Sequence, residues 1–109
     1  NFYGLPPTWV TSHLFIVQGY FSDTLPLYSG GSVALLHLDN NYYSSVKECL
    51  DFFYPKMGKG SIIILDEYGG TFDLSHFRGA RKSVDEFCER TGNKVIQDTA
   101  YGKWHIVIE

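Results

Sequence analysis

The chain has 109 residues, of which 44% are hydrophobic and 19% are charged. This balance is typical of one soluble globular domain and excludes an intrinsically disordered chain. The formal net charge of −3 offers no basic surface, so we expect neither a nucleic-acid partner nor a membrane partner. The apolar runs are too short to span a bilayer and no signal-peptide pattern is present, which favours a cytoplasmic protein.

The first part of the chain predicts little regular structure apart from one strand. Residues 1–12 carry two adjacent prolines without steady periodicity, which favours an irregular segment. Residues 13–18 contain a short apolar run that stops at Gly19, and this run predicts a strand. Residues 19–31, with a proline and paired glycines, predict a loop.

The middle of the chain predicts two strands joined by a helix. Residues 32–38 form a second strand-like apolar run. Apolar residues then recur at helical spacing from Val46 onward, and Ser45 with Glu48 fits a capping box for this helix. Residues 61–65 are rich in isoleucine and apolar on both faces, as in a central parallel strand.

The last part of the chain predicts a second helix followed by a pair of strands. The helix covers residues 75–90, and Gly92 is its expected stop. Residues 94–97 and 104–108 predict two strands, joined through a turn at residues 101–102.

This order of elements predicts an α/β fold with a mostly parallel sheet that ends in an antiparallel strand pair. Both cysteines, Cys49 and Cys88, fall on or beside an apolar helix face. They indicate buried thiols in a reducing compartment and not a disulfide. The residues expected to form the core are Val33, Leu36, Ile63, Leu65, Val84, Phe87 and Val107.

Acidic residues follow two of the predicted parallel strands directly. Asp39 comes after the strand at residues 32–38, and Asp66 with Glu67 comes after the strand at residues 61–65. The carboxyl ends of parallel strands meet at one edge of a sheet, where α/β folds bind ligands. Clustered carboxylates repel one another unless a proton or a hard cation such as Mg²⁺ neutralises them. The alternative is that each acid only caps the helix that follows it.

Five sequence blocks resemble the macrocin and mycinamicin O-methyltransferase family, in the family's order and spacing. They are residues 19–26 (GYFSDTLP), 38–45 (LDNNYYSS), 54–56 (YPK), 60–69 (GSIIILDEYG) and 80–87 (ARKSVDEF). The resemblance implies the carboxyl-terminal portion of a Rossmann-like class I methyltransferase fold. It also implies S-adenosylmethionine as methyl donor, a sugar or another hydroxyl-bearing small molecule as acceptor, and a divalent cation, usually Mg²⁺.

Carried over residue by residue, the resemblance assigns candidate sites. The candidate metal ligands are Asp39, Asp66 and Glu67, and the residues expected beside the adenine of S-adenosylmethionine are Gly19, Tyr20 and Phe21. The sequence departs from the family where an aspartate becomes Asn41 and a glutamate becomes Ser44. We assign no catalytic base, although His76 is the histidine predicted nearest the metal, while His37 and His105 are interpreted as structural.

The family's first two strands and its glycine-rich cofactor loop have no counterpart in residues 1–109. We therefore expect one partial methyltransferase domain that is inactive by itself. In the family's sheet the strand at residues 13–18 would be separated from the strand at residues 32–38 by the two missing strands. We expect this segment to be displaced, or to pair with a second copy in a homo-oligomer.

Two other functions remain open at this stage. The chain could be a non-catalytic binding or dimerisation remnant of a methyltransferase. Residues 62–67 also fit the Walker B strand of a P-loop ATPase, but the GxxxxGK[ST] loop that such an enzyme requires is absent from the sequence.

Overall fold

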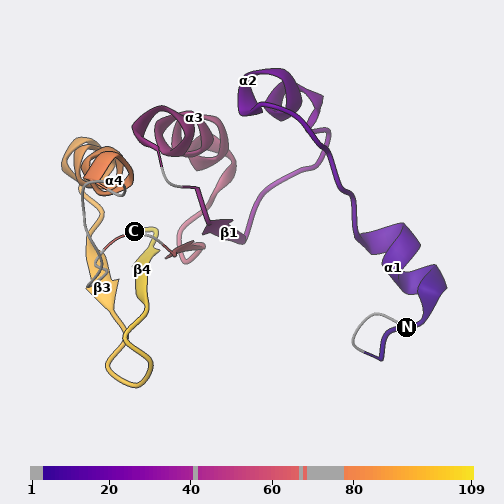
Figure 1. The fold of residues 1–109 in the computed structure, drawn as a ribbon. Helices are drawn as coiled ribbons and strands as arrows, with labels where there is room; N and C mark the ends of the chain where they lie inside the picture. The colour runs from indigo at the N-terminus through magenta and orange to yellow at the C-terminus, as the bar shows by residue number, and fades with distance from the viewer. Residues whose placement is uncertain (1–3, 41, 67, 69–77) are drawn as a thin grey trace.

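The computed structural model describes residues 4–40, 42–66, 68 and 78–109. Its elements in chain order are α1 (Pro7–His13), α2 (Phe21–Thr24), η1 (Leu25–Leu27), β1 (Leu35–Leu38), α3 (Tyr43–Phe53), η2 (Tyr54–Lys56), β2 (Ile62–Leu65), α4 (Arg78–Thr91), β3 (Val95–Gln97) and β4 (Trp104–Val107). Figure 1 shows α3 and α4 side by side over the sheet, with α1 well away from it.

The sheet has four strands in the order β1-β2-β4-β3. β1 and β2 are parallel, whereas β4 pairs antiparallel with both β2 and β3. Of the four described strands, β1, β2 and β3 therefore run in one direction and β4 runs in the other. The predicted α/β fold, with a mostly parallel sheet that ends in an antiparallel pair, is confirmed.

The core lies between one face of the sheet and the helices α3 and α4. Its largest fully buried side chains include Ile63 and Ile106 from the sheet, and Leu50, Val84 and Phe87 from the helices. Side chains alternate along a strand, so every second strand residue faces the helices. The opposite face carries partly exposed apolar side chains, namely Leu35, Ile62, Ile96 and Val107.

Most of the expected core residues are confirmed. Ile63, Leu65, Val84 and Phe87 are buried, and Val33 and Leu36 pack partly buried against them. The assignment of Val107 is wrong, because its side chain is 37% exposed while Ile106 and Ile108 are buried. The alternation along β4 places these two isoleucines on the core face and Val107 on the other.

The structure corrects the predictions for residues 4–31. Helix α1 forms where an irregular segment was expected, because the prolines stand at its start, where the missing N–H is not needed. The predicted strand at residues 13–18 is wrong, since these residues belong to no strand and are exposed. None of the described strands lies beside its four apolar residues to form backbone hydrogen bonds with them. α2 and η1 replace the predicted loop at residues 19–31 in part.

The ends of the helices differ in how well they follow the sequence signals. The capping box is wrong, because α3 begins two residues before Ser45, whose hydroxyl donates to the Tyr42 carbonyl oxygen at 3.0 Å. Gly92 ends α4 as predicted, with φ +78° and an N–H that donates to the Cys88 carbonyl oxygen at 2.8 Å. Residues 75–77, the predicted start of this helix, lie outside the described residues.

Candidate functional site

The sheet register places three charged residues in one row. β1, β2 and β4 remain in register up to Leu65 at the end of β2. One residue further, on the same three neighbouring strands, stand Asp39, Asp66 and Lys103. The Asp66 N–H donates to the Leu38 carbonyl oxygen at 3.0 Å and extends the ladder to this row. Residues in register on neighbouring strands are only about 5 Å apart.

Asp39 and Asp66 stand next to each other at the ends of β1 and β2, as the register of these two strands indicates. A hydrogen bond from the protonated Asp39 carboxyl to Asp66, together with the negative charge of Asp66, raises the pKa of Asp39. Neighbouring carboxylates repel each other unless a proton or a positive charge neutralises them. The Lys103 Nζ and the His37 Nε2 both lie 3.8 Å from Asp66 Oδ1, so the positive charge of Lys103 and the imidazole of His37 adjoin this carboxylate.

The donor set fits a hard divalent cation as far as the structure describes it. Asp39 and Asp66 are carboxylates, the ligands that Mg²⁺ prefers, and they follow two paired strands at the same level of the sheet. The third predicted ligand, Glu67, lies outside the described residues, as do Asn41 and His76. Among the residues that the structure describes, no group of three His, Cys, Asp or Glu side chains is close enough to hold a metal. The three-carboxylate site therefore stays a prediction.

A cavity of about 430 Å³ adjoins the acidic pair on the side of β1. Its lining includes Asp39 and His37 from β1 and its end, and apolar side chains such as Val17 and Phe21 from the N-terminal part. An apolar cavity that ends in a few polar groups is the usual form of a small-molecule site. Of the three residues predicted beside the adenine, the structure brings Phe21 to this cavity.

Gly19 and Tyr20 do not line that cavity. The Tyr20 side chain is 81% exposed. Gly19 has φ +145°, and a Cβ there would lie 3.0 Å from the Thr24 methyl carbon. The glycine is thus needed for the turn into α2. A role of Gly19 and Tyr20 in cofactor binding stays a prediction.

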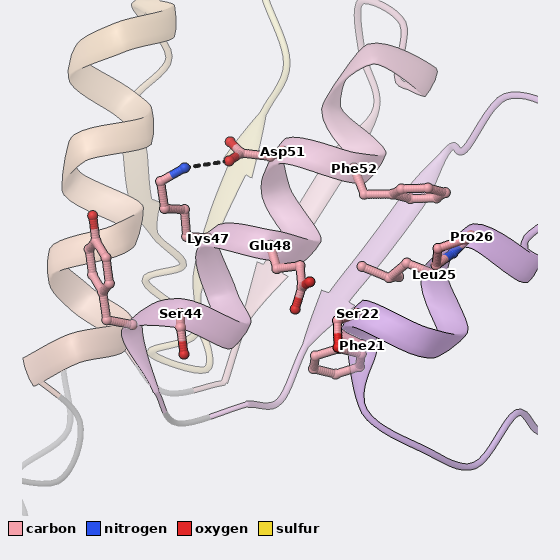
Figure 2. Close-up of a pocket in the computed structure, with 10 residues that line it drawn as sticks. Phe21, Ser22, Leu25, Pro26, Ser44, Lys47, Glu48, Asp51 and Phe52 are labelled. Atoms are coloured by element: carbon pink, nitrogen blue, oxygen red, sulfur yellow. Dashed lines mark hydrogen bonds and ion pairs between the residues drawn. The ribbon is translucent and has the colours of Figure 1, made fainter.

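A second, open groove of about 600 Å³ lies between α2–η1 and α3 (Figure 2). Figure 2 shows Glu48 directed from α3 toward Ser22, while Lys47 is turned aside to Asp51, with which it forms an ion pair. Phe21 lines both this groove and the cavity beside Asp39. Because the groove's lysine is already paired and neither residue of the acidic pair lines it, we place the candidate site at the acidic row.

Sequence reasoning missed two residues of this site. His37 was interpreted as structural, yet its side chain is 54% exposed and contacts Asp66. Lys103 was not considered, although the strand at residues 104–108 was predicted to follow a turn directly. The strand register could have identified both residues. His37 lies two positions before Asp39, on the same face of β1, and Lys103 lies opposite Asp66.

The comparisons with known proteins identify the family. The model of the macrocin O-methyltransferase family (TylF) matches residues 6–99. The chain belongs to this family. The resemblance predicted from the sequence blocks is thus confirmed, and the alternative of a P-loop ATPase is set aside.

Curated O-methyltransferases resemble the chain over part of their own length. The 8-demethyl-8-(2,3-dimethoxy-alpha-L-rhamnosyl)-tetracenomycin-C 4′-O-methyltransferase of Streptomyces olivaceus is 36% identical over 83 residues, which are 73% of this chain and 32% of that protein. The mycinamicin III 3″-O-methyltransferase of Micromonospora griseorubida is 28% identical over 76 residues, 70% of this chain and 27% of that protein. The chain thus spans about a third or less of these relatives.

Solved structures confirm the methyltransferase fold. The O-methyltransferase NovP superposes with a TM-score of 0.67 at 22% identity, covering 93% of this chain and 42% of that one. A TDP-rhamnose 3′-O-methyltransferase of calicheamicin biosynthesis superposes with a TM-score of 0.68 at 21% identity, covering 84% of this chain and 40% of that one. None of the described helices has the length and apolar character to cross a membrane.

Proposed function

We propose that this chain serves in an S-adenosylmethionine-dependent O-methyltransferase that acts, with a divalent cation, on a hydroxyl of a sugar or another small molecule. Family membership and the named activities of the relatives support the methyl transfer. The observation that carries the cation is the register of β1 and β2, which places the carboxylates of Asp39 and Asp66 side by side at the ends of two neighbouring strands.

The residues of the chain would act by binding and orientation. Asp39 and Asp66 would hold the cation from one side, because both carboxylates stand in the same row of the sheet. When bound, the cation would lower the pKa of the acceptor hydroxyl and S-adenosylmethionine would supply the methyl group. Apolar side chains such as Phe21 and Leu25 would keep water from the cavity beside Asp39.

A calorimetric titration with Mg²⁺ or Mn²⁺ tests the cation. The variant Asp66→Asn is expected to lose cation binding, because one of the two described carboxylates is neutralised. The matched control is Glu89→Gln, which makes the same charge change on the exposed face of α4. Identical binding curves for the wild type and Asp66→Asn would overturn the cation assignment.

A titration with S-adenosylmethionine tests whether the cofactor site requires the family's first two strands and glycine-rich loop in addition to this chain. The sequence of this chain carries no glycine-rich cofactor loop, so we expect very weak binding by this chain alone. Binding should be restored when a segment with the family's first two strands and that loop is supplied. Tight binding by the isolated chain would contradict this arrangement.

The second candidate function is a non-catalytic binding or dimerisation module. The exposed apolar residues 14–17 and the partly exposed sheet face favour it, because both surfaces could pair with another copy. This candidate predicts a homodimer by sedimentation and no cation binding. A monomer that binds Mg²⁺ would exclude it.

A further inference from the structure

The β3–β4 hairpin fixes the position of Lys103. The Asp98 N–H donates to the Lys103 carbonyl oxygen at 2.7 Å, and the Gly102 N–H donates to the Asp98 carbonyl oxygen at 2.7 Å. Gly102 adopts φ +70°, which a glycine does without strain. The Asp98 carboxylate also accepts the Ala100 N–H at 3.1 Å. The turn is therefore closed by bonds of its own, and it places Lys103 opposite Asp66.

Negatively charged side chains outnumber permanent positive charges around Lys103. Its Nζ lies 3.8 Å from Asp66 Oδ1, and Asp66 in turn stands beside Asp39 in the same row of the sheet. Asp98 and His105 line the same shallow cavity of about 440 Å³ as Lys103 and Asp66. Within the described part of the row, Lys103 is thus the one permanent positive charge beside two interacting carboxylates.

The Lys103 side chain is more exposed to solvent than the Asp66 side chain. The Asp66 side chain is 32% exposed and held at a strand end, whereas the Lys103 side chain is 65% exposed. A lysine ammonium is a compact point charge on a flexible stem, so it can turn into solvent without disturbing the backbone. A counter-ion of this kind neutralises the pair and can still be displaced by a stronger one.

We propose that Lys103 is the internal counter-ion of the Asp39–Asp66 pair: a positioning residue that keeps the carboxylates together and competes with the cation they bind. The competition with a cation rests on the proposed function, because it requires that the pair binds a cation. The counter-ion role requires only the folded chain. The two parts are tested separately.

A double-mutant cycle in thermal unfolding, with EDTA present, tests the counter-ion. Lys103→Met is expected to lower Tm by about 2 °C, as for a partly exposed ion pair, and to lower it by less when Asp66→Asn is present. The matched control Lys59→Met removes the same charge from the exposed turn before β2, at the end of this strand away from Asp66, and should act equally in both backgrounds. An equal effect of Lys103→Met in both backgrounds would overturn the counter-ion role.

A Mn²⁺ titration tests the competition. Lys103→Met should bind Mn²⁺ about threefold more tightly at low ionic strength, and the gain should shrink as salt screens the charge. Lys59→Met should bind as the wild type does. Measurable but equal binding by the wild type and Lys103→Met would overturn the competition and leave the cation site intact. If neither protein binds Mn²⁺, the cation assignment itself fails, while the unfolding cycle still decides the counter-ion role.

Discussion

Two parts of the molecule contain similarly apolar sequence, but one exposes its apolar side chains and the other buries them. In the N-terminal arm, residues 4–20, the Phe15 side chain is 78% exposed and that of Ile16 is 85% exposed. In the C-terminal unit, residues 33–109, the Phe87 side chain is 1% exposed. Apolar composition alone therefore does not create a core. A segment is buried only when other elements of the chain cover it.

The hydrogen bonds show the same contrast. The C-terminal unit bonds each of its strands to at least one neighbour. Over the described part of the arm, residues 15–19 make no backbone hydrogen bond to other described residues. An extended segment without such bonds gains nothing that offsets the conformational entropy of ordering it. The following variants test how independent the two parts are.

The largest contrast is expected between two phenylalanine truncations. Phe87→Ala should lower the free energy of unfolding by about 3–5 kcal/mol, because it leaves a cavity under α4. Phe15→Ala, the same change in the arm, should alter it by less than about 0.5 kcal/mol. Urea denaturation followed by circular dichroism measures both. Comparable losses for the two variants would mean that the arm belongs to the cooperative unit.

Thiol reactivity should separate the two parts by rate. Burial raises the pKa of both Cys49 and Cys88 to about 11, so both thiols stay protonated at pH 8. A cysteine introduced by Ile16→Cys in the exposed arm should keep an ordinary pKa and react about 100-fold faster with a disulfide reagent. Mass spectrometry of the modified protein identifies the reacted site. Equally fast reaction of the native cysteines would contradict their burial.

A smaller effect is expected where α3 and α4 meet. A Cβ on Gly79 would lie 2.8 Å from the Tyr43 backbone nitrogen, so Gly79→Ala should force the helices apart. We expect a loss of about 1–3 kcal/mol in the free energy of unfolding. Gly58→Ala is the control, because a Cβ there meets nothing within 4 Å. Equal stability of the two variants would show that this contact is not tight.

The smallest effect is expected at the acidic row of the C-terminal unit. The pKa of Asp39 is raised by its hydrogen bond to Asp66 and by the charge of Asp66. The stability that Asp39 contributes is thus present in acid and is lost as the pH rises through the raised pKa. In EDTA, Asp39→Asn should raise Tm slightly at neutral pH and flatten this pH dependence. A lower Tm at neutral pH would contradict the repulsion.

The sequence predicts the C-terminal unit well because its signals are local and consistent. The acids after β1 and β2 are neighbours since parallel strands present their carboxyl ends at one edge. Val107 is misassigned because β4 is apolar at consecutive positions, so periodicity cannot decide which face is covered. Lys103 depends on the hairpin register, which the geometry around Gly102 determines. The residues after the capping-box signal form a helix, but the chain enters it earlier than the motif indicates.

The arm is predicted poorly for a different reason. An apolar run such as residues 14–17 is read as a strand, but strand formation requires a neighbour that the local sequence does not reveal. The prolines that favour an irregular segment are equally suited to the first turn of a helix, and α1 uses them in that way. Both errors arise where the outcome is decided by contacts outside the segment.

The partly exposed sheet face has a practical consequence for handling the protein. Leu35, Ile62, Ile96 and Val107 leave apolar surface open to solvent on this face, and among the described residues β1 has no partner on its outer side. Such a surface attracts hydrophobic dyes and other protein molecules even when the fold is intact. Dye fluorescence would therefore be a poor measure of unfolding here. Concentration, more than temperature, would set the conditions under which the protein stays in solution.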